Sequence, residues 1–321
     1  MAVYTEVSPD ALARFIEGYE LGRVLDYRGI ADGVENTNYR VDTERGQFFL
    51  TLFEKRVDPA DLPFFLGLME HLARVGLSCP TPVRDRHDEM LTELMGRPAT
   101  LITFLKGTSI SAPKPHHCTD IGQALATLHR ASADFSLRRA NALGPSGWAP
   151  LFARFKDHAD EITPGLARTI ADELSFLAAH WPRDLPQGVI HADLFPDNAF
   201  FLDDKFSGMI DFYFACNDAL AYDLAVCLNA WCFDPQLKFD TAKGGALIEA
   251  YENVRPLTAT ERAALPILAR GAALRFLLTR AYDWINTPPD ALVARKDPGE
   301  YLEKLRFHQS VASLLAYGLG T

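Results

Sequence analysis

The 321-residue sequence has no stretch of about 18 uncharged apolar residues, which is the minimum for a helix that crosses a bilayer. It also begins without the basic residues and apolar run of a secretory signal. Cysteine is scarce: the five residues include no Cys-x-x-Cys pair, which argues against a disulfide framework or a zinc ribbon. We therefore expect a cytoplasmic protein with reduced thiols and no membrane partner.

The sequence also has fewer basic than acidic residues. Lys and Arg total 32 against 42 for Asp and Glu, a formal net charge of −10 that opposes binding to nucleic acids. We expect small-molecule partners, while the oligomeric state cannot be read from the sequence. A hydrophobic content of 48% is typical of a globular protein, and the length suits two domains or one large one.

Several familiar motifs are missing. The sequence has no Gly-x-x-x-x-Gly-Lys-Ser/Thr and no Gly-x-Gly-x-x-Gly, so neither a Walker-type nor a dinucleotide-binding fold is supported. No internal repeat is found. His116 and His117, next to Cys118, suggest a metal site at first sight, but neighbouring side chains diverge and nearby prolines mark a loop. We expect no metal there.

The first hundred residues contain β-branched and aromatic clusters separated by turn-forming residues, the pattern of an antiparallel meander. Apolar residues then recur at helical spacing from Pro59 to about Val75. The predicted strands are Leu21–Ile30, Val34–Val41, Gln47–Phe53, Pro82–Arg86 and Ala99–Phe104. The sequence thus predicts an N-terminal lobe, residues 1–104, with a small antiparallel sheet and one crossing helix.

The remaining chain, residues 105–321, has mainly helical periodicity. Helices are predicted at Cys118–Ser132, Leu151–His158, Leu166–His180, Ala219–Phe233, Thr241–Tyr251, Ala259–Trp284 and Pro298–Tyr317. Between them, Gly188 to Ile210 consists of short strand-like runs broken by polar clusters. We therefore predict an α+β, bilobal fold with a larger, mainly helical C-terminal lobe.

The strongest chemical signal lies in that strand-like region. His191, Asp193 and Asn198 occupy a loop between two short apolar runs, and Asp211 follows a third run. Each of these residues alone would more often brace a tight turn. Together they offer oxygen ligands for Mg²⁺ and a separate carboxylate that can accept a proton from an alcohol, which indicates phosphoryl transfer.

This pattern resembles the catalytic and metal-binding loops of the aminoglycoside-phosphotransferase-like family of small-molecule kinases. The resemblance implies a protein-kinase-like fold, ATP as phosphoryl donor and Mg²⁺ as cofactor. It makes Asp193 the catalytic residue and Asn198 and Asp211 the metal ligands. The stretch from Asn217 to Ala225 is similar to the family's Asp-Pro-x-x-x-Asp-Leu-Ala segment. His191, Asp218 and Asp223 are accordingly expected to support the catalytic loop.

Gly33 to Tyr39 and Phe49 to Lys55 resemble the N-terminal lobe of homoserine kinases within this family. Thr51 stands where the family carries a phosphate-binding Lys, whose partner Glu would fall near Phe65. Lys55 or backbone donors could substitute, and the sequence does not decide between them. The nucleotide-binding residues implied by the resemblance are Gly33, Asn36, Thr37, Asn38, Thr51, Thr103 and Leu105.

The resemblance implies that the enzyme is a homoserine kinase, which phosphorylates the hydroxyl of L-homoserine in threonine biosynthesis. A zwitterionic acceptor needs a cation for its carboxylate and oxygen atoms for its ammonium group. Arg280, Trp231 and Asp234 are candidate acceptor-binding residues. Two alternatives stay open: a kinase for choline, hydroxylysine or an aminoglycoside, and a nucleotide-binding protein without transferase activity, which the missing Lys at Thr51 permits.

Overall fold

The structure is a computed structural model that describes residues 5–30, 36–54, 57–287 and 295–319. The chain divides into two compact units. Unit 1 comprises Met1–Gly107 and Ser207–Tyr213, and unit 2 comprises Thr108–Phe206 and Phe214–Thr321. The first division thus falls three residues after the expected limit of the N-terminal lobe, and a short segment that contains Asp211 also belongs to unit 1.

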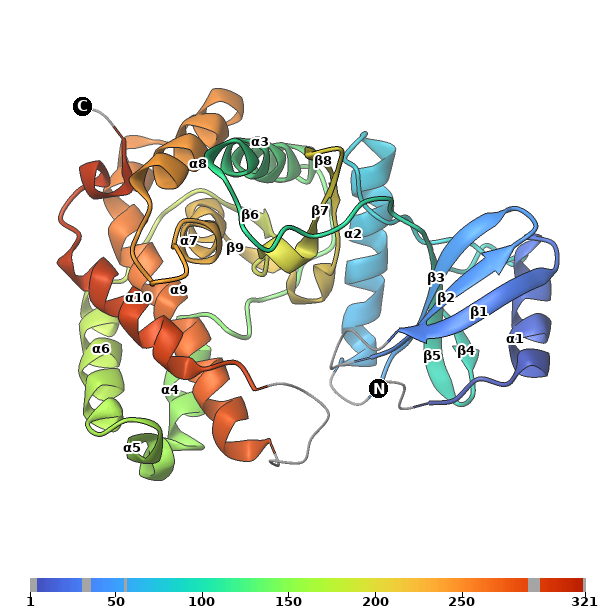
Figure 1. Cartoon of the computed structure of the whole chain (residues 1–321), viewed down its shortest axis with the longest axis horizontal. Helices are drawn as coiled ribbons and strands as arrows, with labels where there is room; N and C mark the ends of the chain where they lie inside the picture. The colour runs from blue at the N-terminus through green and yellow to red at the C-terminus, as the bar shows by residue number, and fades with distance from the viewer. Residues whose placement is uncertain (1–4, 31–35, 55–56, 288–294, 320–321) are drawn as a thin grey trace. The chain divides into compact units, whose positions relative to one another are not determined.

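Unit 1 is built on a five-stranded antiparallel sheet (Figure 1). Its strand order is β1 (Val24–Ile30), β2 (Thr37–Thr43), β3 (Gly46–Leu52), β5 (Arg97–Thr103) and β4 (Thr92–Leu94). Alternate residues of β2, such as Tyr39 and Val41, are buried, as expected for a strand with one covered face. Leu12 and Ile16 of helix α1 (Pro9–Ile16) belong to the same apolar core.

The crossing helix of unit 1 is α2 (Leu62–Arg74), which confirms the helix predicted from Pro59 to Val75. Its buried residues recur every three or four positions. The strand predicted at Pro82–Arg86 is wrong: only Pro82 forms an isolated bridge, with Ile102. The sequence reading missed α1 and the three-residue strand β4, because such short elements carry too few periodic positions.

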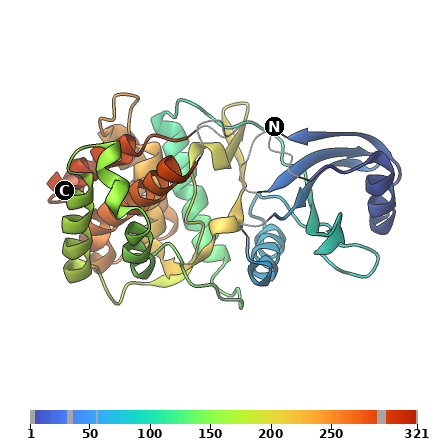
Figure 2. The ribbon, with the colours of Figure 1, turned by 90° about the horizontal axis from the view of Figure 1, so that it is seen from below.

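Unit 2 is mainly helical. Its helices are α3 (Pro115–Ala131), α4 (Pro145–Ala153), α5 (Ala159–Ile162), α6 (Leu166–His180), α7 (Leu220–Trp231), α8 (Thr241–Val254), α9 (Ala259–Asn286) and α10 (Pro298–Ser310). Almost every residue of α7 is buried, so this helix forms the centre of the unit. In Figure 2, α4 and α6 lie beside the long helix α9. None of the described helices is long and apolar enough to cross a membrane.

Two short sheets interrupt the helices. β6 (Gln187–Ile190) pairs with β9 (Cys216–Ala219), and β7 (Ala199–Leu202) pairs with β8 (Lys205–Met209), inside which the division between the units falls. The sequence reading missed β9, and it placed α4 six residues too late and ended α10 seven residues too late. The predicted α+β, protein-kinase-like class is confirmed by this architecture together with the structural similarities given below.

Candidate active site

The loop from His191 to Asn198 links β6 to β7, and a buried carboxylate fixes its first two residues. Asp223 of α7 accepts hydrogen bonds from the main-chain N–H groups of His191 (2.7 Å) and Ala192 (2.8 Å). Ala192 has a φ of 61°, a left-handed conformation that a residue with a side chain adopts only when its surroundings impose it. Asp223 therefore imposes the shape of the loop just before Asp193.

Asp223 is itself held by a buried network that links three helices. His129 of α3 donates from Nε2 to Asp223 (3.0 Å), and its Nδ1 forms a hydrogen bond with the hydroxyl of Tyr251 on α8 (2.7 Å). Arg255 in turn donates to the Tyr251 oxygen (3.1 Å). Burial alone would raise the pKa of Asp223, but the hydrogen bond and nearby charge of His129 outweigh it and lower that pKa. Asp223 is thus a charged anchor.

Asp193 lies between a cation and an amide. The guanidinium of Arg275, on α9, lies 3.8 Å from its carboxylate and also donates to the carbonyl of Ala192. Arg275 is 3% exposed, whereas the Asp193 side chain is 19% exposed. The amide nitrogen of Asn198 donates to the main-chain oxygen (2.8 Å) and the carboxylate (3.3 Å) of Asp193. The structure thus brings Asp193 and Asn198 together within the loop.

Three further residues singled out from the sequence, Trp231, Asp234 and Asp218, lie outside this loop and form structural hydrogen bonds. Trp231, which is 1% exposed, donates its indole N–H to the carbonyl of Leu194 (2.7 Å). Asp234 accepts from the main-chain N–H groups of Gln236 and Lys238 within its own turn. Asp218 accepts from the side chain of Asn141 (2.7 Å) and lies in β9, opposite Gly188 of β6.

A compact charged cluster, formed by Arg280 of α9 with Glu300 and Lys304 of α10, lies in the same unit. Glu300 forms ion pairs with both Arg280 and Lys304. Burial alone would raise the pKa of Glu300, but Lys304 and then Arg280 lower it overall, while burial lowers the pKa of Lys304. Both cations lie over the ring of Tyr301, within 4.6 Å of its centroid. The cluster holds two cations and one carboxylate.

Sequence reasoning assigned no role to Glu300, Lys304 or His129, and it considered Arg275 only as part of a helix that could line the acceptor site. Arg275 carried one usable signal, a charged residue inside the apolar stretch of α9. Glu300 and Lys304 stand four residues apart on α10, a spacing that is common on solvated helix surfaces and therefore not diagnostic.

In unit 1, several of the residues expected to bind nucleotide form hydrogen bonds to one another or to Glu54. The Thr51 hydroxyl donates to the Asn38 side-chain oxygen (2.9 Å), and the Asn36 side chain accepts from the N–H of Glu54 (3.2 Å). Thr37 donates its hydroxyl to Glu54 (2.9 Å). These contacts hold the beginning of β2 against β3. Gly33 lies outside the described residues.

Three further residues named from the sequence lie elsewhere in unit 1. The Thr103 hydroxyl, at the end of β5, accepts from the N–H of Thr81 (2.9 Å), and Leu105 follows two residues later. Asp211 is exposed and has a φ of 62°, another left-handed conformation. Its main chain follows β8, where the Met209 N–H donates to the carbonyl of Ser78 (3.1 Å).

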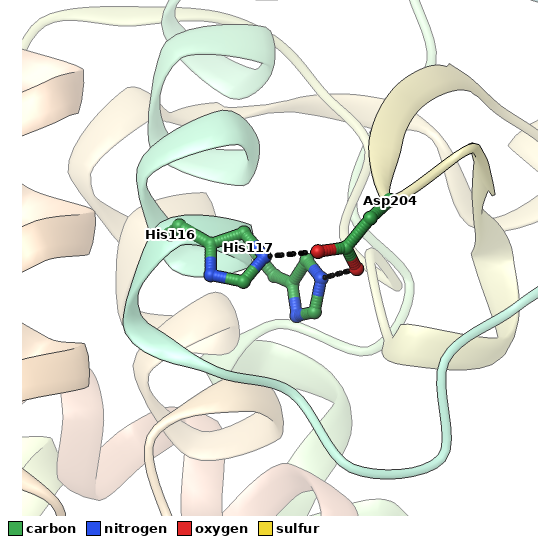
Figure 3. A group of neighbouring side chains, drawn as sticks. All are labelled: His116, His117 and Asp204. Atoms are coloured by element: carbon green, nitrogen blue, oxygen red, sulfur yellow. Dashed lines mark hydrogen bonds and ion pairs between the residues drawn. The ribbon is translucent and has the colours of Figure 1, made fainter.

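His116 and His117 converge with Asp204, as Figure 3 shows. Their Nε2 atoms lie 3.0 and 2.7 Å from the two carboxylate oxygens. His117 also accepts the N–H of Lys114 at Nδ1 (3.0 Å), so its proton is on Nε2 and is donated to Asp204. A metal ion at Nε2 would displace that proton to Nδ1. Nδ1 could then no longer accept from the Lys114 N–H, and the cap of α3 would be lost. The cluster therefore fastens α3 to the β7–β8 turn.

Comparisons with known proteins agree with this arrangement. Residues 26–257 match the model of the phosphotransferase enzyme family. The chain is 60% identical to a protein from Xanthobacter autotrophicus and 58% identical to one from Parvibaculum lavamentivorans, each named homoserine kinase, over 99% of both chains in each case.

Solved structures resemble the fold at much lower identity. A choline kinase from Cryptosporidium parvum aligns with a TM-score of 0.68 at 14% identity, covering 94% of each chain. A microcompartment-associated aminopropanol kinase aligns with a TM-score of 0.64 at 17% identity, covering 98% of this chain and 99% of that one. The kinase-like fold, the braced loop around Asp193 and the family match lead to one conclusion: the chain belongs to the phosphotransferase enzyme family and is an ATP-dependent small-molecule kinase.

Proposed function

We propose that the protein transfers the γ-phosphoryl group of ATP to the hydroxyl of L-homoserine, forming O-phospho-L-homoserine for threonine biosynthesis. The observation that carries this proposal is the full-length identity of 58–60% with proteins named homoserine kinase. Kinases for choline and for other amino alcohols share the fold at 14–17% identity, a level that supports the fold and not their acceptors. A cytoplasmic location remains a prediction from the cysteine content.

Asp193 is the proposed catalytic residue. Its carboxylate would accept a hydrogen bond from the acceptor hydroxyl, orient that oxygen toward the γ-phosphorus and take up its proton as the new bond forms. Two features support this role: the loop is fixed by Asp223, and the guanidinium of Arg275 lies 3.8 Å from the Asp193 carboxylate. Because phosphoryl transfer demands mainly positioning and charge stabilisation, a rigid loop suits the reaction.

Members of this kinase family use ATP with a divalent metal ion, and we propose Mg²⁺ held by Asn198 and Asp211. The donor set fits a hard cation, because both residues offer oxygen. The amide nitrogen of Asn198 bonds to Asp193, which leaves the amide oxygen as the group that can bind a cation. Asp211 contributes an exposed carboxylate. When bound, Mg²⁺ would neutralise negative charge on the phosphates.

Residues 1–104 are proposed to bind the nucleotide, and residues 105–321 to carry the catalytic loop and the acceptor site. Gly33, Asn36, Thr37 and Asn38 would cover the phosphates, while the main chain near Thr103 and Leu105 would meet the adenine edge. Thr51 lacks the charge of the family's Lys and already bonds to Asn38, so we propose that it acts by shaping β2 and β3.

For the acceptor, we propose that Arg280 binds the carboxylate of homoserine. The support is the cluster with Glu300 and Lys304, in which the two cations exceed the single carboxylate by one charge. His191, Asp218 and Asp223 remain proposed supports of the loop. Trp231 and Asp234 are less suited to contact the acceptor, because the Trp231 indole N–H bonds to Leu194 and Asp234 Oδ1 accepts from the N–H groups of its own turn.

The proposal is tested by measuring ADP release with L-homoserine, choline, 5-hydroxylysine and kanamycin at equal concentrations. L-Homoserine should give the highest rate. Faster turnover of another acceptor would assign the enzyme to that acceptor, and MgATP binding without turnover of any acceptor would favour a nucleotide-binding protein.

A further inference from the structure

Ala192, the residue before Asp193, is held at both of its main-chain polar groups by buried charged side chains. Its N–H donates to Asp223 of α7 (2.8 Å), and its carbonyl accepts from the guanidinium of Arg275 on α9. The Asp223 side chain is fully buried and that of Arg275 is 3% exposed. Two helices thus hold a residue whose left-handed conformation, with a φ of 61°, leads the chain into Asp193.

Arg275 contacts the loop with a group of fixed shape. A guanidinium is planar and carries five N–H donors, so it can face two acceptors at a set angle to each other. One Nη atom of Arg275 donates to the Ala192 carbonyl, and the other lies 3.8 Å from a carboxylate oxygen of Asp193. One rigid group therefore lies against both the peptide before Asp193 and the Asp193 side chain.

The next residue of α9 contacts the same loop on the other side of Asp193. The guanidinium of Arg275 lies 4.1 Å from the ring centroid of Phe276, which restricts its position. The Phe276 ring in turn meets the ring of Phe195 edge-on, with 4.8 Å between centroids. Two neighbouring residues of α9 thus contact the loop just before and just after the proposed catalytic residue.

The pair of Arg275 and Asp193 differs from another buried pair on α9. Arg270 donates two hydrogen bonds to the carboxylate of Glu173, at 2.8 and 2.6 Å, which is the geometry of a tight structural ion pair. Arg275 stays 3.8 Å from the Asp193 carboxylate, beyond hydrogen-bond distance, and makes its hydrogen bond to the main chain instead. Arg275 therefore guides the Asp193 carboxylate without closing over it.

We propose that Arg275 is a positioning residue for Asp193: together with Asp223 it holds Ala192, and through its second Nη atom it sets the direction in which the Asp193 carboxylate meets the acceptor hydroxyl. The inference rests on the proposed catalytic role of Asp193. It makes the seating of α9 on the loop a determinant of the transfer rate and not of nucleotide affinity.

The test is a double-mutant cycle on the single-turnover rate of phosphoryl transfer, measured with saturating MgATP and L-homoserine. Arg275→Lys keeps the charge but loses the planar group, so it should lower the rate by about 10- to 100-fold and leave ATP affinity within about two-fold. In the Asp193→Asn background, the same change should lower the rate by less than about three-fold, because the group that Arg275 positions is already disabled. Arg275→Gln is a second variant for which the same pattern is expected.

The matched control is Arg270→Lys, on the same helix, because Arg270 also pairs with a carboxylate and lies over a ring, that of Phe176 at 3.7 Å. It should lower thermal stability at least as much as Arg275→Lys and leave the transfer rate unchanged. If Arg275→Lys has no effect on the rate, or the same effect in both backgrounds, the positioning role is wrong while the catalytic role of Asp193 stands. If Asp193→Asn itself transfers at the normal rate, that catalytic role fails and the inference fails with it.

Discussion

The guanidinium of Arg275 lies 3.8 Å from the carboxylate of Asp193, and it also binds the carbonyl of Ala192, the preceding residue. One buried cation thus contacts both the main chain before the proposed catalytic residue and its carboxylate. Whereas Arg275 donates to the loop, Asp223 accepts hydrogen bonds from it, from the main-chain N–H groups of His191 and Ala192. The loop is therefore rigid where the chemistry needs a defined geometry.

Replacing Asp193 should separate catalysis from nucleotide binding. Asp193→Asn keeps the shape of the side chain but cannot accept the proton, so turnover should fall by about 10²-fold or more. ATP affinity, measured by calorimetry, should remain within about two-fold of the original. Asp197→Asn, an exposed neighbour in the same loop, serves as control and should keep normal turnover. Near-normal turnover of Asp193→Asn would remove Asp193 from the catalytic role.

Asn198 should affect the metal requirement more than acceptor binding. Asn198→Ala removes an oxygen ligand and should raise the Mg²⁺ concentration for half-maximal rate by about ten-fold. The KM for the acceptor should change little, because the proposed acceptor contact is Arg280. An unchanged Mg²⁺ dependence would contradict the assignment, as would a rate insensitive to a chelator.

Arg280 should discriminate between acceptors with and without a carboxylate. Arg280→Gln should raise the KM for L-homoserine by about 10- to 100-fold, the effect of losing one charged hydrogen bond. With 3-aminopropanol, which has no carboxylate, the same variant should show the same low rate as the original protein. Arg306→Gln, which breaks an exposed pair with Glu303 on α10, is the control. An equal loss with both acceptors would mean that Arg280 is structural.

Stability should depend on pH through His308, a fully buried residue of α10. Its ring bonds to the Tyr317 hydroxyl (2.8 Å) and Asn229 (3.2 Å), and burial lowers its pKa to about 3. An unfolded chain binds a proton there below pH about 6.5, whereas the folded chain does not, so unfolding becomes easier as the pH falls.

Urea titrations should show this effect between pH 6.5 and 3. The free energy of unfolding should decrease by about 1.4 kcal/mol per pH unit from this proton and level off below pH 3. His308→Gln should reduce the slope by that amount, although the variant will be less stable at every pH. His180→Gln changes an exposed histidine and should leave the slope unaltered. Equal slopes for the original protein and His308→Gln would contradict the prediction.

Local patterns in the sequence predicted much of the fold, because hairpins and amphipathic helices are encoded over few residues. Strands β2 (Thr37–Thr43) and β3 (Gly46–Leu52) pair as a hairpin whose register is set by the single turn between them. Helix α2 lies where the apolar spacing predicted a helix. The short strand β9 could not be predicted in the same way, since it depends on β6, which lies far from it in the sequence. Strand β4 pairs with the neighbouring strand β5, but its three residues are too few to show a pattern.

In the candidate site, too, contacts between residues close in the sequence were predictable, and contacts between distant residues were not. Asp193 and Asn198 were predictable as neighbours because they stand only five positions apart in one loop. Arg275 stands 83 residues from Ala192, and its approach depends on how α9 packs against α7 and the loop.

The central claim is that L-homoserine is the preferred acceptor, and internal competition tests it most directly. The protein is incubated with limiting γ-³²P-labelled ATP, Mg²⁺ and equal concentrations of L-homoserine, choline and kanamycin, and the labelled products are separated. Because the acceptors compete for one enzyme, the distribution of label reports the ratios of kcat/KM. The account predicts that nearly all label appears in O-phospho-L-homoserine, and label mainly in phosphocholine or phosphorylated kanamycin would contradict it.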